Sequence, residues 1–285
     1  MDWGYKAALT ASLVAAVMMA MRLFDRRWAG LLAGAPVITA PALLWLAHDQ
    51  GAAFAAHSAV GSVMASAVAP VFAVGYIVMA RVARPLACTV GASALGLLAA
   101  WLLQGLQGQA LLSLLVAISA GALALAWLGP IPPGSWVRPL RGEPWLSAGV
   151  AGAVTALVGL LAPGLGAFWV GALTGLPLIA GCALVHLHRA GTAANLRRFA
   201  QGYVIGIVAK AGFAFVFAQS LDLGIGWALF VATVTGAAVM LALSAALSAL
   251  SAGPRRQSAG RAPSPALPTP NAAPGSAMDA TAPGL

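Results

Sequence analysis

Charge is scarce in this sequence. Only 7% of its 285 residues are charged, and only six are Asp or Glu. A soluble domain of this length needs far more charge to cover its surface. Hydrophobic residues make up 61% of the chain and occur in long runs rather than as one amphipathic pattern. The composition therefore predicts an all-α, polytopic membrane protein whose main partner is the lipid bilayer.

Cysteine is nearly absent, and so are the signatures of enzymes. Cys88 and Cys182 both lie in apolar segments, which argues against a disulfide framework or a metal site. His186 and His188 are two residues apart and point to different faces of a helix, so they are not expected to bind a metal together. No HExxH, GxSxG or phosphate-loop motif occurs. We therefore predict no catalytic residues, no cofactor and no enzyme activity.

What the sequence does contain is a series of membrane-length apolar segments. Each can cross about 30 Å of hydrocarbon, at about 1.5 Å per residue, if the shorter ones draw on flanking residues. We expect about nine spans, at 5–21, 29–47, 53–80, 85–103, 109–128, 146–162, 166–187, 199–218 and 225–250.

Arginine supports this count. The loops after the first, third, fifth, seventh and ninth spans all contain arginine, whereas the four loops between them contain neither Lys nor Arg. The positive-inside rule then predicts that the N-terminus lies outside the cytoplasm and the C-terminus inside it. The net charge of +9 is explained by these loops, so no nucleic-acid partner is expected. The tail 251–285 is rich in Pro, Ala, Ser and Gly, which predicts a disordered cytoplasmic segment.

Two of the spans resemble each other. At an offset of 141 residues, eight of eighteen positions are identical: Trp28/Trp169, Gly30/Gly171, Leu32/Leu173, Gly34/Gly175, Pro36/Pro177, Ile38/Ile179, Ala42/Ala183 and Leu43/Leu184. Weaker identities continue to Phe72/Phe213. Spans 1–4 and 6–9 are therefore interpreted as two related units, with chance similarity between apolar segments as the alternative.

The fifth span has no counterpart, so five crossings separate equivalent points of the two units. Because five is odd, the second unit is expected to lie inverted in the membrane. The predicted organisation is a first four-helix repeat (1–104), a linker helix with a cytoplasmic loop (105–145), an inverted second repeat (146–250) and the tail (251–285).

Glycine and proline interrupt both related spans. In lipid, the backbone groups that such residues free must find partners in protein or in a watered cavity. Interrupted spans at matching places in inverted repeats point to a binding site, and half-helix N-termini there would favour an anion. Thr39 is expected to cap the second half-helix, just before Pro41. The candidate substrate-binding residues are Gly34, Pro36, Thr39, Pro41, Thr174, Gly175, Pro177, Tyr203 and Lys210. Close helix packing by small residues explains the glycines equally well.

Lys210 is the one charged residue well inside a predicted span. A lysine in the membrane is costly, which makes it a candidate for function by default. Tyr203 lies seven residues earlier, so the two side chains share a helix face. The alternative is that the span is shifted and Lys210 snorkels toward an interface.

The segment AGLLAGAPVITAPALLWLAHDQG, followed by Gly61 and Ser62, resembles the core of GlpM-like small bacterial membrane proteins. VGALTGLPLIAGCALVHLHRAG resembles the same core. The resemblance implies a duplicated, fused four-helix unit in the inner membrane and a link to the cell envelope. It supplies no catalytic residues.

Two functions follow from these patterns. The leading hypothesis is a transporter or permease for a small solute, with an anion favoured by the half-helix N-termini, at the interface of the two repeats. The alternative is a non-transporting scaffold or an accessory to an envelope-assembly complex. A homo-oligomer is compatible with both.

Overall fold

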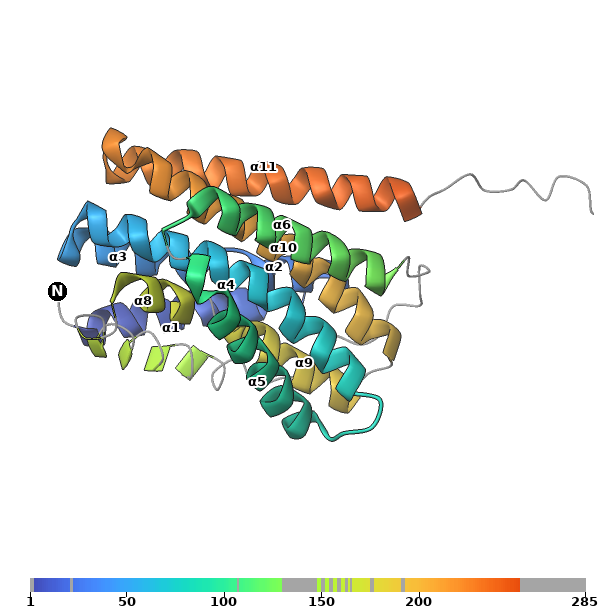
Figure 1. The fold of residues 1–285 in the computed structure, drawn as a ribbon. Coiled ribbons are helices and arrows are strands. Elements are labelled where there is room, and N and C mark those ends of the chain that lie inside the picture. Colours follow the sequence, from blue (N-terminus) through green and yellow to red (C-terminus); the bar gives the residue numbers. More distant parts are fainter. Residues whose placement is uncertain are drawn as a thin grey trace, which may run out of the picture. The chain divides into compact units, whose positions relative to one another are not determined.

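Helices are the regular secondary structure of the part of the chain that the structure describes. The computed structural model describes residues 3–20, 23–106, 108–129, 148–149, 152–153, 156–157, 160–161, 164, 166–174, 177–190 and 193–251 (Figure 1). Residues up to Ser251 form one compact unit. The predicted tail lies, from residue 252 on, outside the described residues.

The helices follow the predicted spans closely. The first five are α1 (Trp3–Ala20), α2 (Arg26–Gly34), α3 (Thr39–Gln50), α4 (Ala52–Met79) and α5 (Pro85–Leu103). A 3-10 turn, η1 (Gln104–Leu106), leads to α6 (Ala110–Leu128). The later elements are α8 (Ala167–Thr174), α9 (Leu178–Ala190), α10 (Ala193–Ser220), the 3-10 turn η2 (Leu221–Leu223) and α11 (Ile225–Ser251).

Among the residues that the structure describes, six helical segments are long and apolar enough to cross a membrane: Arg26–Gln50, Ala52–Met79, Pro85–Leu106, Ala110–Leu128, Ala193–Leu223 and Ile225–Ala249. They fit a polytopic membrane protein. The other three predicted spans correspond to α1, to the partly described stretch 148–164 and to α8 with α9. The count of nine crossings therefore stays a prediction.

The second predicted span is interrupted, as its glycines and prolines indicate. Helix α2 ends at Gly34 and α3 begins at Thr39, so residues 35–38 break the helix. In the related span, α8 ends at Thr174 and α9 begins at Leu178. The two breaks overlap at Pro36 and Pro177, which the 141-residue offset relates.

The long helices α4 and α10 match in length as well as in position. Each has 28 residues, and their first residues, Ala52 and Ala193, are 141 positions apart (193 − 52). Helix α10 begins six residues before the predicted start at 199, because Asn195, Arg197 and Arg198 extend the helix beyond its apolar segment. The two helices pack against each other, and Figure 1 shows them running in opposite directions.

The shorter elements cross between the two predicted repeats. Helix α2 packs against α10, and its counterpart α8 packs against α4. Helix α5 packs against α4, as α11 does against α10. The predicted linker, α6, lies against both α4 and α10. Each long helix therefore receives the same set of neighbours.

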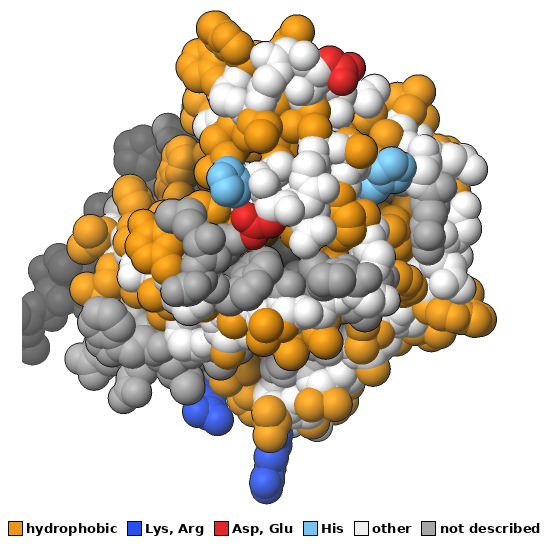
Figure 2. Space-filling view, turned by 90° about the vertical axis from the view of Figure 1, so that its left-hand side faces the viewer, with side chains coloured by type: hydrophobic (Ala, Val, Ile, Leu, Met, Phe, Trp, Pro, Cys, Tyr) orange, Lys and Arg blue, Asp and Glu red, His pale blue; other side chains and the backbone are white. Residues whose placement is uncertain are grey.

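Charged side chains separate toward the two ends of the helices. One end, the arginine end, holds Arg26, Arg27, Arg81, Arg84, Arg189, Arg197 and Arg198 at or near helix termini, together with Asp25 at the start of α2. The other, the aspartate end, holds His48, Asp49, His57 and Asp222. Figure 2 shows the aspartate end face-on, with acidic and histidine side chains among apolar ones and with Lys and Arg only at the lower edge of the view.

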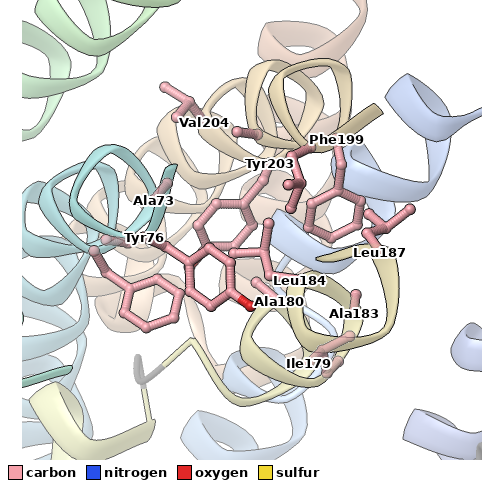
Figure 3. Packing of buried hydrophobic residues seen from close by; sticks show 14 of the residues in the cluster. Ala73, Tyr76, Ile179, Ala180, Ala183, Leu184, Leu187, Phe199, Tyr203 and Val204 are labelled. Carbon is pink, nitrogen blue, oxygen red and sulfur yellow. The ribbon is translucent and has the colours of Figure 1, made fainter. Parts of the chain in front are cut away.

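Two clusters of buried apolar side chains fill the interior. One joins Phe72 and Tyr76 of α4 to Leu184 of α9 and to Phe199 and Tyr203 of α10 (Figure 3). The other joins α3 to α10 through Leu43, Leu46, Phe213 and Phe217. Phe213 stacks on Phe217, as Phe72 contacts Tyr76. The two clusters thus use repeat-related positions.

Candidate functional site

The α2–α10 crossing is built on glycine. A Cβ added to Gly30 would lie 2.7 Å from the backbone nitrogen of Tyr203, and one added to Gly34 would lie 2.8 Å from that of Ile207. From α10, an added Cβ on Gly202 would lie 2.9 Å from the nitrogen of Leu31. Real Cβ atoms do not approach backbone atoms so closely. The two helices are therefore in backbone contact, as small residues at four-residue spacing allow.

The α4–α8 crossing repeats this contact at equivalent residues. A Cβ added to Gly30 would meet the backbone oxygen of Phe199 first. A Cβ added to Gly171 would meet the backbone oxygen of Ser58 first, and Ser58 is 141 positions before Phe199.

The other side of the crossing matches too. An added Cβ on Gly202 would meet Arg27 and Leu31, and one on Gly61 would meet their counterparts Phe168 and Ala172. The correspondence holds residue by residue, although the side chains differ.

A polar contact accompanies the α4–α8 crossing. Ser62 donates its hydroxyl to the backbone oxygen of Gly171 at 3.0 Å, and Ser66 donates to the oxygen of Ser62 at 2.9 Å. Ser58, one turn earlier, is wholly buried, and its hydroxyl has no hydrogen-bond partner within the described part of the chain. A polar stripe thus runs along α4 beneath α8.

The break between α2 and α3 largely satisfies its own backbone. The nitrogen of Ala35 donates to Leu31 and Leu32, and that of Val37 donates to Ala35 at 2.8 Å. Pro36 has no donor to satisfy, and its oxygen accepts from Ala40 at 2.8 Å. Little unpaired backbone from this break is therefore left to hold a ligand.

The prediction that Thr39 caps the second half-helix is wrong. The N-cap position of α3 is Ile38, and Thr39 is the first residue inside the helix, where its side chain is 2% exposed. Pro41 falls in the first turn of α3, where a missing backbone donor costs nothing. The helix therefore starts one residue earlier than a threonine cap requires.

Lys210 is buried within α10. Its side chain is 4% exposed, and ten residues of helix follow it. Snorkelling to an interface does not fit this burial. Gly206 packs against Gly34 at the end of α2, and Lys210 lies four residues further along the same face of α10. It is therefore level with the break between α2 and α3.

The predicted site residues meet only in part. Gly34 and Tyr203 are in contact, because an added Cβ on Gly34 would meet the backbone of Tyr203. Tyr203 is 1% exposed, and its hydroxyl has no hydrogen-bond partner among the described residues. Pro36 and Pro177 are partly buried in the two breaks. Gly175 and the side chain of Thr174 lie outside the described parts.

The sequence does not predict two other polar contacts between helices. Arg27 donates to the hydroxyl of Ser248 at 2.9 Å and to the backbone oxygen of Ser244 at 2.7 Å, which ties α2 to α11. Gln201 donates to the backbone oxygen of Gly129 and so ties α10 to the end of α6. Spacing within one helix gives no signal for such contacts. The glycine pair Gly202 and Gly206, by contrast, was visible as small residues four apart.

Tyr76 and His188 form a further polar pair, at the arginine end. The Tyr76 hydroxyl lies 3.4 Å from Nδ1 of His188, and their rings meet edge to face at 5.9 Å. Tyr76 is wholly buried in α4, and His188 is partly buried in the last turn of α9. The pair therefore joins the long helix of one predicted repeat to the half-helix of the other.

No family model, curated protein or solved structure matches this chain. The resemblance to GlpM-like proteins therefore stays a prediction from the quoted segments. The site has to be interpreted from its own geometry.

Proposed function

We propose that this chain is an inner-membrane transporter built from two inverted repeats, and that it moves a small, anionic solute past Lys210. The observation that carries the proposal is the matched pair of crossings. Gly30 lies against the backbone of Phe199, and Gly171 lies against that of Ser58. Both members of the second contact are related to those of the first by 141 positions. Chance similarity between apolar segments would not produce equivalent backbone contacts in two places.

Helix directions support the inversion. The equivalent helices α4 and α10 run in opposite directions (Figure 1). The first half-helix of each repeat packs on the long helix of the other, α2 on α10 and α8 on α4, so the repeats are interlocked. Inverted repeats with broken helices at their interface are a common plan among secondary transporters.

The charge inside the bundle supports an anion. Lys210 sits beside a helix break, away from both ends of α10, and its repeat-related position is Ala69 (210 − 141). A buried cation in a membrane protein usually marks a substrate or ion pathway. Residues that hold structure alone would be expected in both repeats, whereas Lys210 occurs in one.

The arginine end supports the orientation. All seven described arginines lie there, with Asp25 beside two of them, and the aspartate end holds Asp49 and Asp222. Under the positive-inside rule the arginine end faces the cytoplasm, which leaves the N-terminus outside.

Flux into proteoliposomes tests the transport proposal. A panel of small anions and matched neutral solutes is offered to wild type, Lys210→Gln and Arg81→Ala, the last removing an exposed arginine from the arginine end. We expect anion flux above empty liposomes for wild type and Arg81→Ala, reduced at least tenfold in Lys210→Gln. Background flux for every solute in folded wild type would refute transport.

The scaffold alternative has one observation of its own. The glycines of both crossings are closed against backbone rather than lining a space. A scaffold needs only such packing. Background flux from folded wild type in the same assay would favour the scaffold.

A further inference from the structure

We propose that the arginine end binds the phosphate group of an anionic phospholipid, between the start of α2 and the first turns of α10. Arg26 and Asn195, which carry this site, are not among the predicted substrate-binding residues. The inference does not rest on the proposed transport function.

The α2–α10 crossing determines which side chains meet at this end. A Cβ added to Gly30 would meet the backbone of Phe199 and of Tyr203. A Cβ added to Gly34, one turn later, would meet the backbone of Tyr203 and of Ile207. Successive turns of α2 therefore lie against successive turns of α10. The two helices run in the same direction, and both begin at the arginine end.

The same register extends back to the first residue of α2. Arg26 precedes Gly30 by one turn, so it lies opposite Asn195 and Phe199 of α10. The side chain of Arg26 is only 7% exposed, although it begins the helix. A crossing that glycine closes at Gly30 is thus held open at its end by a buried cation.

Asn195 supplies a buried donor at the same place. Its side chain is 5% exposed, and its amide nitrogen has no hydrogen-bond partner among the residues that the structure describes. Asn195 lies on the same face of α10 as Phe199 and Gly202, which is the face that packs on α2. Buried polar groups almost always have a partner, so this amide calls for one that the chain does not supply.

The start of α2 offers further donors. Asp25, at the N-cap position, makes no side-chain cap hydrogen bond. The first backbone N–H groups of a helix have no partner within it, and they point out of its N-terminal end. Since the N-terminal ends of α2 and α10 lie side by side, both helix dipoles favour an anion between them.

The surrounding charge is positive. Arg27 follows Arg26, and Arg198 shares the α2-facing side of α10 with Asn195. Among the described residues, Asp25 is the one acidic side chain at this end, and it is exposed. Phosphate has more acceptor oxygens than a carboxylate, so it better matches an arginine fork, an amide and a helix N-terminus together.

The apolar surroundings favour a lipid as the source of the phosphate. Leu23, Phe24 and Trp28 are exposed around the start of α2. Trp127 is exposed too, and the guanidinium of Arg197 lies over its ring at 5.9 Å. Tryptophan beside arginine is typical of a membrane surface, where basic pockets between helices bind anionic head groups. Acyl chains can cover these side chains, whereas a free phosphate cannot.

The other repeat lacks these groups. The positions related to Arg26 and Asn195 are Ala167 (26 + 141) and Phe54 (195 − 141). Phe54 packs against the apolar cluster between α3 and α10. Apolar side chains thus occupy the equivalent place at the aspartate end, and the proposed site belongs to one repeat only.

Thermal unfolding of the delipidated protein in a non-ionic detergent tests the site. Midpoints are recorded against increasing phosphatidylglycerol, phosphatidylcholine or inorganic phosphate, the last at constant ionic strength. For wild type we expect phosphatidylglycerol to raise the midpoint saturably, and the other two to have much smaller effects. No saturable rise with phosphatidylglycerol would overturn the site, and an equal rise with inorganic phosphate would overturn the lipid as its occupant.

Two variants and a control tie the titration to these residues. Arg26→Gln removes the charge, and Asn195→Leu replaces the amide by an apolar side chain of similar size. Because Asn195→Leu removes a buried donor without a partner, the lipid-free variant should be at least as stable as wild type, which keeps the test open if Arg26→Gln folds poorly. Half-saturation should need at least tenfold more phosphatidylglycerol in both variants.

Arg81→Gln is the matched control, since it removes the same charge from the exposed turn between α4 and α5 at the same end. It should titrate as wild type does. Half-saturation at the wild-type concentration in Asn195→Leu, or a tenfold loss in Arg81→Gln, would overturn the assignment of the phosphate to this site.

Discussion

The α2–α10 and α4–α8 crossings share a backbone arrangement but not their chemistry. Gly30 and Gly171 make the same close approach, yet α10 carries Tyr203 where α4 carries Ser62 (203 − 141). Helix α10 also carries Lys210 where α4 carries Ala69. In return, α4 carries Tyr76 where α10 carries Phe217. The shared features concern packing, and those that differ are polar. The residues to test for function are therefore the unshared ones, and those to test for stability are the shared glycines.

The largest expected loss of stability comes from placing a side chain where two helices are in backbone contact. Gly202→Val forces a branched side chain against the backbone of α2, and relief requires the two helices to separate. Overpacking typically costs about 1–3 kcal/mol, and a backbone clash lies at or above the top of that range. We expect little folded protein in detergent, measured as the monodisperse fraction in size-exclusion chromatography. Gly212→Val is the control, since its added Cβ would lie an ordinary 3.9 Å from Val239; a loss as large in the control would contradict the account.

A matching substitution at the α4–α8 crossing tests whether the two crossings are equivalent. Gly61→Val meets the counterparts of the atoms that Gly202→Val meets, so the two variants should lose stability to a similar degree. Thermal midpoints in detergent measure this. If Gly61→Val were as stable as wild type, the two crossings would not be equivalent.

Lys210→Met tests the chemistry that the repeats do not share. Replacing a buried charge by an apolar side chain of similar length is often neutral or stabilising. We expect an unchanged or higher thermal midpoint together with at least a tenfold loss of anion flux. Unfolding of this variant would mean that Lys210 serves structure, and full flux would remove it from the pathway.

A smaller effect is expected at Arg27, whose counterpart is Phe168. Arg27→Ala removes both hydrogen bonds to the end of α11, of which that to Ser248 is exposed and that to Ser244 partly buried. Exposed polar contacts contribute about 1 kcal/mol or less. The thermal midpoint should fall by a few degrees, and Ser248→Ala should fall less. A midpoint equal to wild type for Arg27→Ala would show that this tie contributes nothing.

Some features of the fold could be predicted from particular residues of the sequence, and others could not. Pro36 and Pro177 located both helix breaks, because proline cannot donate a backbone hydrogen bond. The 141-residue offset paired α4 with α10 but did not give their equal lengths, because the predicted span 199–218 left out the polar residues with which α10 begins. The partner of α2 could not be derived, since glycines at four-residue spacing reveal a small face and not the helix that covers it.

The side-chain contacts between helices could not be predicted from the sequence for a similar reason. Tyr76 and His188 are 112 positions apart and meet only because α9 packs near α4. Thr39 misled because threonine is a frequent cap, whereas here the preceding residue takes that place. Helix ends are decided by tertiary packing within a residue or two.

The central claim is the inversion of the two repeats, and sidedness tests it most directly. His48 and Arg189 are repeat-related (48 + 141 = 189), and both are exposed near the ends of α3 and α9. Single cysteines are placed at each in a Cys88→Ala, Cys182→Ala background and treated in intact spheroplasts with a membrane-impermeant maleimide. The account predicts labelling of His48→Cys from outside and of Arg189→Cys only after permeabilisation. Labelling of both from the same side would contradict it.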